Sequence, residues 1–83
     1  MSAAVVREEL EKAVSLVTAA RRLLATGTMV DLSALEGKVR FVCSTIEEMD
    51  RDEGLPLKPA MENLIAGLDR LAAAIRERQD PAG

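Results

Sequence analysis

Few side chains in this chain could take part in chemistry. The sequence has 83 residues, no histidine and one cysteine, Cys43. Without histidine there is no general base whose ordinary pKa lies near neutrality, and no Ser-His or Cys-His pair for nucleophilic catalysis. The sequence also has no glycine-rich phosphate loop and no cysteine or histidine cluster with metal-ligand spacing. We therefore expect a protein that is not an enzyme and that needs no cofactor or metal.

Two interpretations of Cys43 remain open. It lies about 65° from the centre of the apolar seam of its expected helix, at the edge of the core, where a cysteine packs as a small hydrophobic residue. The alternative is a reactive thiol, or a disulfide between two copies of the chain. A single cysteine cannot form an internal disulfide, which is typical of a protein kept in a reducing compartment.

Acidic residues gather in the segment 47–53. Glu47, Glu48 and Asp50 lie at the expected end of a helix, where the helix dipole favours cations. A basic surface on a partner would neutralise them, and the alternative is a simple solvated helix end. Residues 50–61 resemble a calcium loop only in part, because the glycine comes one position early and the twelfth residue is methionine.

The helices that position these groups are predicted by apolar residues at alternating spacings of three and four. Three such stretches predict helices at about 3–25, 32–50 and 57–78. Their seams are Val6, Leu10, Ala13, Val17, Ala20 and Leu24, then Leu32, Leu35, Val39, Val42, Ile46 and Met49, then Met61, Leu64, Leu68, Leu71 and Ile75. Short connections predict an all-α, up-down-up antiparallel three-helix bundle. We expect residues 1–83 to form one domain, with 79–83 as a short tail.

Local signals set the expected helix ends. Gly27 suits the left-handed position after the first helix. The second helix has two competing start signals, Asp31 as N-cap and a capping box from Ser33 to Glu36, and Asp31 is favoured because it keeps Leu32 inside the helix. Gly54 is expected to break the chain, with the third helix beginning between Pro56 and Pro59. Within the first helix, Glu8 and Lys12 are spaced for an ion pair.

Some apolar and small residues lie away from the seams. Val14, Leu16 and Leu23 are expected to widen the buried face of the first helix. Phe41, the only aromatic residue, lies about 135° from the seam of the second helix, on the same side as Ala34 and Gly37. A large side chain beside small ones is typical of a surface on which another helix docks. The alternatives are that Phe41 folds over the flank of the bundle or belongs to a wider core.

A row of small residues also runs along the third helix. Ala60, Gly67 and Ala74 recur every seven residues. Small residues let a neighbouring helix approach closely. That neighbour is either another helix of the bundle, which we favour, or a helix of a second subunit.

Composition and charge narrow the class of partner. The net charge is −3, and there is one aromatic side chain. Nucleic acids need a basic face, and single strands also need aromatic stacking, so no nucleic-acid partner is expected. No apolar run reaches the ~20 residues that span a bilayer, and the start of the chain lacks a signal-peptide pattern. We expect a cytoplasmic protein with no membrane partner. A small core without disulfides is marginal, which makes a homodimer a reasonable source of stability.

Two segments carry a resemblance to known proteins. TGTMVDLSALEGKVRFVCSTIEEM and LKPAMENLIAGLDRLAAAI resemble small uncharacterised helical proteins of alphaproteobacteria. The layout is also similar to flagellar and type III export chaperones, which are small, acidic and helical. That resemblance implies a bacterial protein that holds an amphipathic segment of a partner in a helical groove.

Together these features predict a non-catalytic module for protein–protein interaction. It either self-associates or captures a helix of another protein, in the manner of a chaperone or adaptor. The expected contact residues are Ala34, Gly37, Phe41, Glu47, Glu48 and Asp50. The alternative is a small regulator or sensor that uses Cys43 or the acidic segment 47–53.

Overall fold

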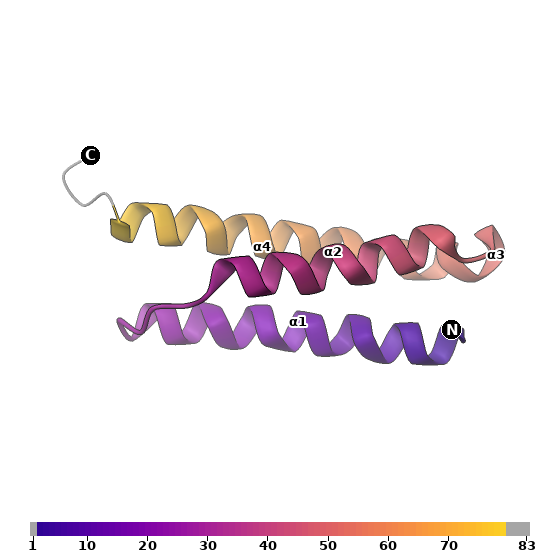
Figure 1. The fold of residues 1–83 in the computed structure, drawn as a ribbon, viewed down its shortest axis with the longest axis horizontal. Helices are drawn as coiled ribbons and strands as arrows, with labels where there is room; N and C mark the ends of the chain where they lie inside the picture. The colour runs from indigo at the N-terminus through magenta and orange to yellow at the C-terminus, as the bar shows by residue number, and fades with distance from the viewer. Residues whose placement is uncertain (1, 80–83) are drawn as a thin grey trace.

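The computed structural model describes residues 2–79 and confirms the all-α fold class. Three long helices, α1 (Ala3–Ala25), α2 (Leu32–Glu48) and α4 (Lys58–Gln79), pack in an up-down-up antiparallel bundle, 48 Å long and 19 by 17 Å across (Figure 1). A single turn α3 (Arg51–Gly54) and a 3₁₀ turn η1 (Leu55–Leu57) join α2 to α4. The start of α1 lies at the same end of the bundle as α3 (Figure 1). The tail expected beyond Gln79 lies outside the described residues.

Both ends of α1 are capped by local hydrogen bonds. At its start, the backbone N–H of Val5 donates to the Ser2 hydroxyl oxygen at 3.3 Å. At its end, Gly27 adopts φ +91°, and the Thr28 N–H donates to the Leu23 carbonyl at 2.9 Å. This is a Schellman motif, so the predicted role of Gly27 is confirmed.

The start of α2 resolves the competition between its two capping signals. The Asp31 carboxylate accepts a hydrogen bond from the Ala34 N–H at 3.2 Å. Leu32 is consequently the first residue of the helix, as predicted. The capping box that begins at Ser33 is not used, because Ser33 already lies inside the first turn.

The predicted connection between the second and third helices is wrong in its details. The second helix ends at Glu48 rather than residue 50, because the chain turns at Met49 and Asp50, which have extended ψ angles of 157° and 141°. Helical structure resumes at Arg51, six residues before the expected start. Gly54 therefore does not break the chain, and its φ and ψ of −80° and −33° are helical.

Two prolines explain the tightened turn at η1. Pro56 and Pro59 lack N–H groups, so the α-helical hydrogen bonds that they would donate cannot form. The Lys58 N–H donates to the Leu55 carbonyl instead, three residues back. A 3₁₀ turn is the usual way in which a helix accommodates this near its start.

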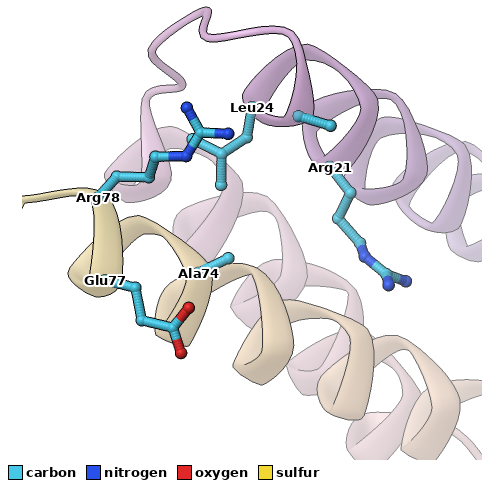
Figure 2. A pocket seen from close by; sticks show the side chains of 6 residues that line it. Arg21, Leu24, Ala74, Glu77 and Arg78 are labelled. Carbon is cyan, nitrogen blue, oxygen red and sulfur yellow. The ribbon is translucent and has the colours of Figure 1, made fainter. Parts of the chain in front are cut away.

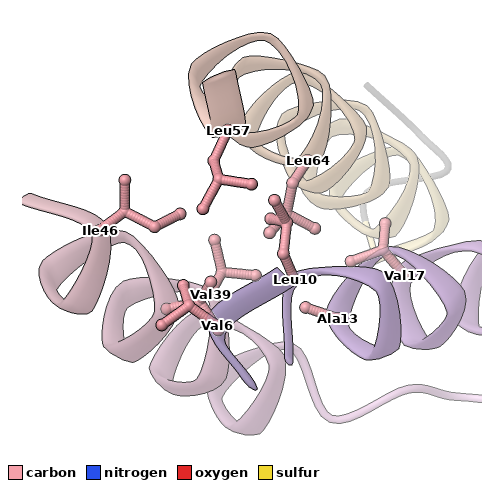
Figure 3. Close-up of a cluster of buried hydrophobic side chains, with 9 residues drawn as sticks. Val6, Leu10, Ala13, Val17, Val39, Ile46, Leu57 and Leu64 are labelled. Atoms are coloured by element: carbon pink, nitrogen blue, oxygen red, sulfur yellow. The ribbon is translucent and has the colours of Figure 1, made fainter. Parts of the chain in front are cut away.

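The core consists of two groups of buried side chains. The larger group fills the half of the bundle next to α3 and draws on α1, α2, η1 and α4 (Figure 3): Val6, Leu10, Ala13, Val17, Val39, Val42, Ile46, Leu57 and Leu64. The smaller group fills the half next to the α1–α2 loop: Ala20, Leu24, Leu71 and Ile75. All six predicted seam residues of α1 are buried, so its register was predicted correctly. Leu57, which is 3% exposed, was not predicted as a core residue.

The buried face of α1 is narrower than predicted. Val14, Leu16 and Leu23 were expected to widen it, but they are 39%, 42% and 49% exposed. A three-helix bundle gives α1 only two neighbours, and the six seam residues already fill the space between them. The small-residue row of α4 faces the interior, as favoured: a Cβ at Gly67 would lie 3.5 Å from Val17 of α1.

Candidate functional site

Three exposed apolar side chains of α1, Val5, Leu16 and Leu23, lie on a regular second stripe that also contains Ala19 and two charged residues. It follows the core seam one residue behind and keeps the same alternation of four and three: Val5, Glu9, Lys12, Leu16, Ala19 and Leu23. At 100° per residue this places the stripe about 100° from the buried seam, on one flank of the helix. This flank of α1, beside the buried seam, is not covered by another helix of the bundle.

A matching stripe runs along α2: Ala34, Lys38, Phe41, Thr45 and Glu48. Lys38 and Leu16 line the same surface cleft, which shows that the two stripes border one groove between α1 and α2. The cleft has a volume of about 710 Å³, and its other lining residues come from α1: Glu8, Glu11, Lys12, Ser15 and Ala19. We call the two stripes together the α1–α2 face. Figure 1 shows the two helices antiparallel and side by side along this face.

The α1–α2 face has an apolar surface that the bundle does not bury. The Phe41 side chain is 58% exposed, so it is not part of the core and does not fold flat over the flank of the bundle. Leu16 and Leu23 expose 42% and 49% of their surface, and Val5 exposes 42%. The Thr45 hydroxyl donates to the Phe41 carbonyl at 2.9 Å, so this polar group is satisfied within its own helix.

Charged residues lie around the apolar members of the α1–α2 face. Because α1 and α2 are antiparallel, the start of α1 adjoins the end of α2, and Glu8, Glu9 and Glu48 share one end of the face. Arg22, near the other end of α1, lies about 100° from the stripe and points away from the core, so it is not part of the face. The cleft itself holds both signs, Glu8 and Glu11 with Lys12 and Lys38.

Two further charges on the face have local partners. Lys12 bonds to Glu9 at 3.5 Å, the one ion pair among residues 2–79, rather than to Glu8 as the sequence predicts. Asp31 caps the start of α2.

The structure separates the predicted contact residues into two places. Ala34, Phe41 and Glu48 lie on the stripe of α2, and Gly37 is exposed beside it, with no atom within 4 Å of a Cβ built there. Glu47 lies elsewhere. It lines a second cleft of about 430 Å³ at the corner between α2 and α4, which the exposed Leu55 also borders.

Asp50 has a different environment from the one predicted. It takes the N-cap position of α3, and its carbonyl accepts from Glu53 and Gly54 N–H groups at 3.0 and 2.9 Å. Asp52 and Glu53 then lie in the first turn of a helical segment, where the dipole favours negative charge. Only Glu47 and Glu48 remain at an unfavourable helix end. The difference arises because the chain turns at Met49 and Asp50, whereas the sequence predicted a break at Gly54.

Cys43 lies on the other flank of α2, half-buried against the larger core group. Burial raises the pKa of its thiol, and the nearby Glu47 carboxylate raises that pKa further. A raised pKa lowers the thiolate fraction at neutral pH, whereas a redox sensor needs thiolate. This environment is that of a packing residue.

A third cleft, of about 370 Å³, lies between the end of α1 and the end of α4 (Figure 2). Arg21 comes from α1 and Glu77 and Arg78 from α4, while Leu24 and Ala74 contribute apolar surface. Figure 2 shows the Arg78 side chain extending from α4 toward Leu24. The charged side chains here are exposed, and their signs are mixed, so the cleft has no charge that selects one class of ligand.

The α1 half of the α1–α2 face was missed from the sequence. The alternation of Val5, Lys12, Leu16, Ala19 and Leu23 was available as a signal, but Leu16 and Leu23 were assigned to the buried face. Two adjacent seams on one helix predict three packing neighbours, and the bundle provides only two.

Other classes of site were also sought. Among residues 2–79, no three His, Cys, Asp or Glu side chains are grouped so as to hold a metal ion. No helix in this range has the length and apolar character that crossing a bilayer requires. Comparison with protein-family models, curated proteins and solved structures gave no match.

Proposed function

We propose that this protein is a non-catalytic helical module for protein–protein interaction, and that its docking surface is the α1–α2 face. The observation that carries the proposal is the exposure of Leu16 and Leu23 on one stripe of α1 and of Phe41 on the matching stripe of α2; Leu16 also lines the cleft between the two helices. Aromatic and aliphatic side chains in contact with a groove are the anchors that helix-in-groove recognition uses. Two further parts of the proposal are a cytoplasmic location, which the single cysteine favours, and the role of a helix-holding chaperone, which the resemblance to export chaperones suggests.

The distribution of exposed apolar side chains favours one docking face over nonspecific hydrophobic association across the whole surface. Of the other exposed apolar side chains, Met29 lies in the loop between α1 and α2 and is 62% exposed, Val14 and Ile65 are 39% exposed, and Leu55 lies at the separate corner cleft. On the α1–α2 face, Leu16 and Ala19 of α1 and Lys38 of α2 line one cleft, and Phe41 follows Lys38 on the same stripe of α2. A partner that covered this groove would give α1 the third neighbour that its two stripes predict.

Site-specific crosslinking in the native cells tests this proposal. A photoreactive phenylalanine analogue replaces Phe41 in one variant and Ala73, exposed on α4, in a control variant. We expect protein adducts from position 41 and none from position 73. Adding Leu16→Asp on the neighbouring helix should remove the adducts, because the two residues are proposed to belong to one surface. Equal labelling from both positions, or adducts that Leu16→Asp leaves unchanged, would contradict the proposal.

A further inference from the structure

We propose that α4 exchanges between two copies of this chain, with Met49 and Asp50 as the hinge. In the exchanged dimer, α2 and α3 of each copy form one continuous helix, and α4 of each copy packs against α1 and α2 of the other. The single-copy fold described above is called the closed chain. This inference does not depend on the docking function, because each bundle of the dimer has the same three helices and leaves its α1–α2 face uncovered.

The hinge is the only break in a long helical stretch. Helical structure covers residues 32–48 and then runs without interruption through α3, η1 and α4, from residue 51 to residue 79. Met49 and Asp50 have φ angles of −72° and −56°, which are already in the helical range, and extended ψ angles of 157° and 141°. A change in these two ψ angles therefore joins α2 to α3.

Joining the two helices also separates two backbones that nearly touch in the closed chain. A Cβ at Gly54 would lie 3.2 Å from the Ile46 carbonyl oxygen. On one continuous helix these residues, eight positions apart, would be separated by about 12 Å along the axis. The Ile46 carbonyl now accepts from the Met49 N–H, three residues on, at 3.2 Å. In the continuous helix it would accept from the Asp50 N–H instead.

The exchanged dimer re-forms the core of the closed chain. In the closed chain α2 and α4 are antiparallel and joined at one end (Figure 1). Two continuous helices that lie antiparallel at their hinges place α4 of one copy beside α2 of the other in the same relative direction. Leu57 and Leu64 would then fill the larger core group together with Ile46 of the second copy. Exchange of an identical element is a low-cost route to a dimer for this reason.

Acidic side chains around the hinge oppose the exchange. The segment 47–53 contains five carboxylates and one basic residue, Arg51. The two hinges lie at the two-fold axis of the exchanged dimer, so the acidic segments of both copies would meet there. Like charges at this distance repel, which favours the closed chain. We therefore expect the natural sequence to exchange only at high protein concentration.

Substitutions at Asp50 test the hinge. Proline fits the closed turn, because φ is −56° at position 50 and Met49 before it is extended, but it cannot continue a helix. Alanine favours the continuous helix and removes the same carboxylate, so Asp50→Ala is the matched control for Asp50→Pro. The Asp50 side chain makes no capping hydrogen bond, so neither variant loses one.

Size-exclusion chromatography with light scattering measures the outcome after both full-length variants are refolded from urea at high protein concentration. We expect a species of twice the chain mass of 8.9 kDa, several-fold more abundant in Asp50→Ala than in the natural sequence and absent from Asp50→Pro. Adding Gly54→Ala to Asp50→Ala should raise the dimer fraction further, because the methyl group crowds only the closed turn. Equal dimer fractions in Asp50→Ala and Asp50→Pro, or a monomer throughout in Asp50→Ala, would overturn the proposal.

A disulfide between α1 and α4 distinguishes exchange from side-by-side association. A Cβ at Gly67 would lie 3.5 Å from the Val17 side chain, so cysteines at these positions are within disulfide reach. Val17→Cys and Gly67→Cys are introduced together with Cys43→Ala and Asp50→Ala, and the oxidised fractions are run on a denaturing gel. We expect linked pairs of chains from the dimer fraction and single chains from the monomer fraction. Single chains from the dimer fraction would overturn the exchange, and this measurement does not need the proline variant to fold.

Discussion

A Cβ atom at Gly54 would lie 3.2 Å from the carbonyl oxygen of Ile46. The two residues belong to different segments, α3 and α2, which approach closely on either side of the turn at Met49 and Asp50. Gly54 has helical backbone angles, so its conformation does not require glycine. The requirement is space, because a backbone oxygen cannot move aside as a flexible side chain can.

Alanine substitutions at two glycines should therefore differ. Gly37 is helical and a Cβ there meets no atom within 4 Å, so Gly37→Ala should raise the free energy of unfolding by about 0.8–1.0 kcal/mol. Gly54→Ala should be less stable than Gly37→Ala by about 1 kcal/mol, because the new methyl group displaces the end of α2. Urea denaturation by circular dichroism at low protein concentration, where association contributes least, measures both. Equal stabilisation at the two positions would show that the turn has room for a side chain.

Asp31 should make a measurable contribution as the N-cap of α2. Asp31→Ala removes the acceptor of the Ala34 N–H and should lower the free energy of unfolding by about 0.5–2 kcal/mol. Ser33→Ala is the matched control, because Ser33 was the competing cap and is exposed in the first turn. Thermal melts of both variants measure the effect. A larger loss at Ser33 than at Asp31 would mean that the helix starts two residues later.

Sequence patterns predicted the three long helices of the bundle, but they did not predict the connection between α2 and α4. The three seams predicted which residues face inward, because buried positions on packed helices must repeat every three to four residues. The turn at Met49–Asp50 has no such signal, since neither residue is a strong helix breaker. The turn is accompanied by the close approach of Gly54 to Ile46. Helix propensity depends on neighbouring residues, so it does not predict this contact.

Only the α2 side of the candidate site was predicted from the sequence, for a related reason. Phe41 stood out because it is a lone aromatic residue far from the seam. Leu16 was assigned to the core because an apolar residue beside a seam is usually buried, and the number of neighbours of α1 is a property of the whole fold. The sequence shows how many faces a helix has, whereas only the assembled bundle shows which of them remain uncovered.

Ionisation of Cys43 should destabilise the fold at alkaline pH. Because burial raises the pKa of this thiol, the folded state holds its proton at pH values where the unfolded chain has lost it. Stability is therefore unaffected by this group below the ordinary thiol pKa, and it falls as the pH rises from there through the pKa of the folded state. Urea denaturation between neutral and alkaline pH should show the decline. Cys43→Ala should have a shallower decline, and identical profiles would contradict the predicted shift.

The raised pKa also predicts slow alkylation. Iodoacetamide at neutral pH should react with native Cys43 more slowly than with the same residue in urea, because alkylation requires both thiolate and access. Mass spectrometry follows the adduct over time. Labelling of the native protein at the unfolded rate would favour the alternative of a thiol sensor.

Truncation of the buried leucines of α4 should be severe. Leu64 and Leu71 are 2% and 0% exposed, and replacing either with alanine should cost about 2–5 kcal/mol. A small core rarely supplies more than about 3–5 kcal/mol, so either variant should be close to unfolding at 25 °C. Leu55→Ala, at a leucine that is 51% exposed, should cost far less. Denaturation midpoints give the comparison, and similar losses at all three leucines would contradict the described core.

The unequal halves of the core have a consequence for local opening. Backbone amides around Leu24 and Ile75, supported by the smaller group, should exchange with deuterium through openings that leave the nine-residue group intact. The bundle would then fray first at the α1–α2 loop.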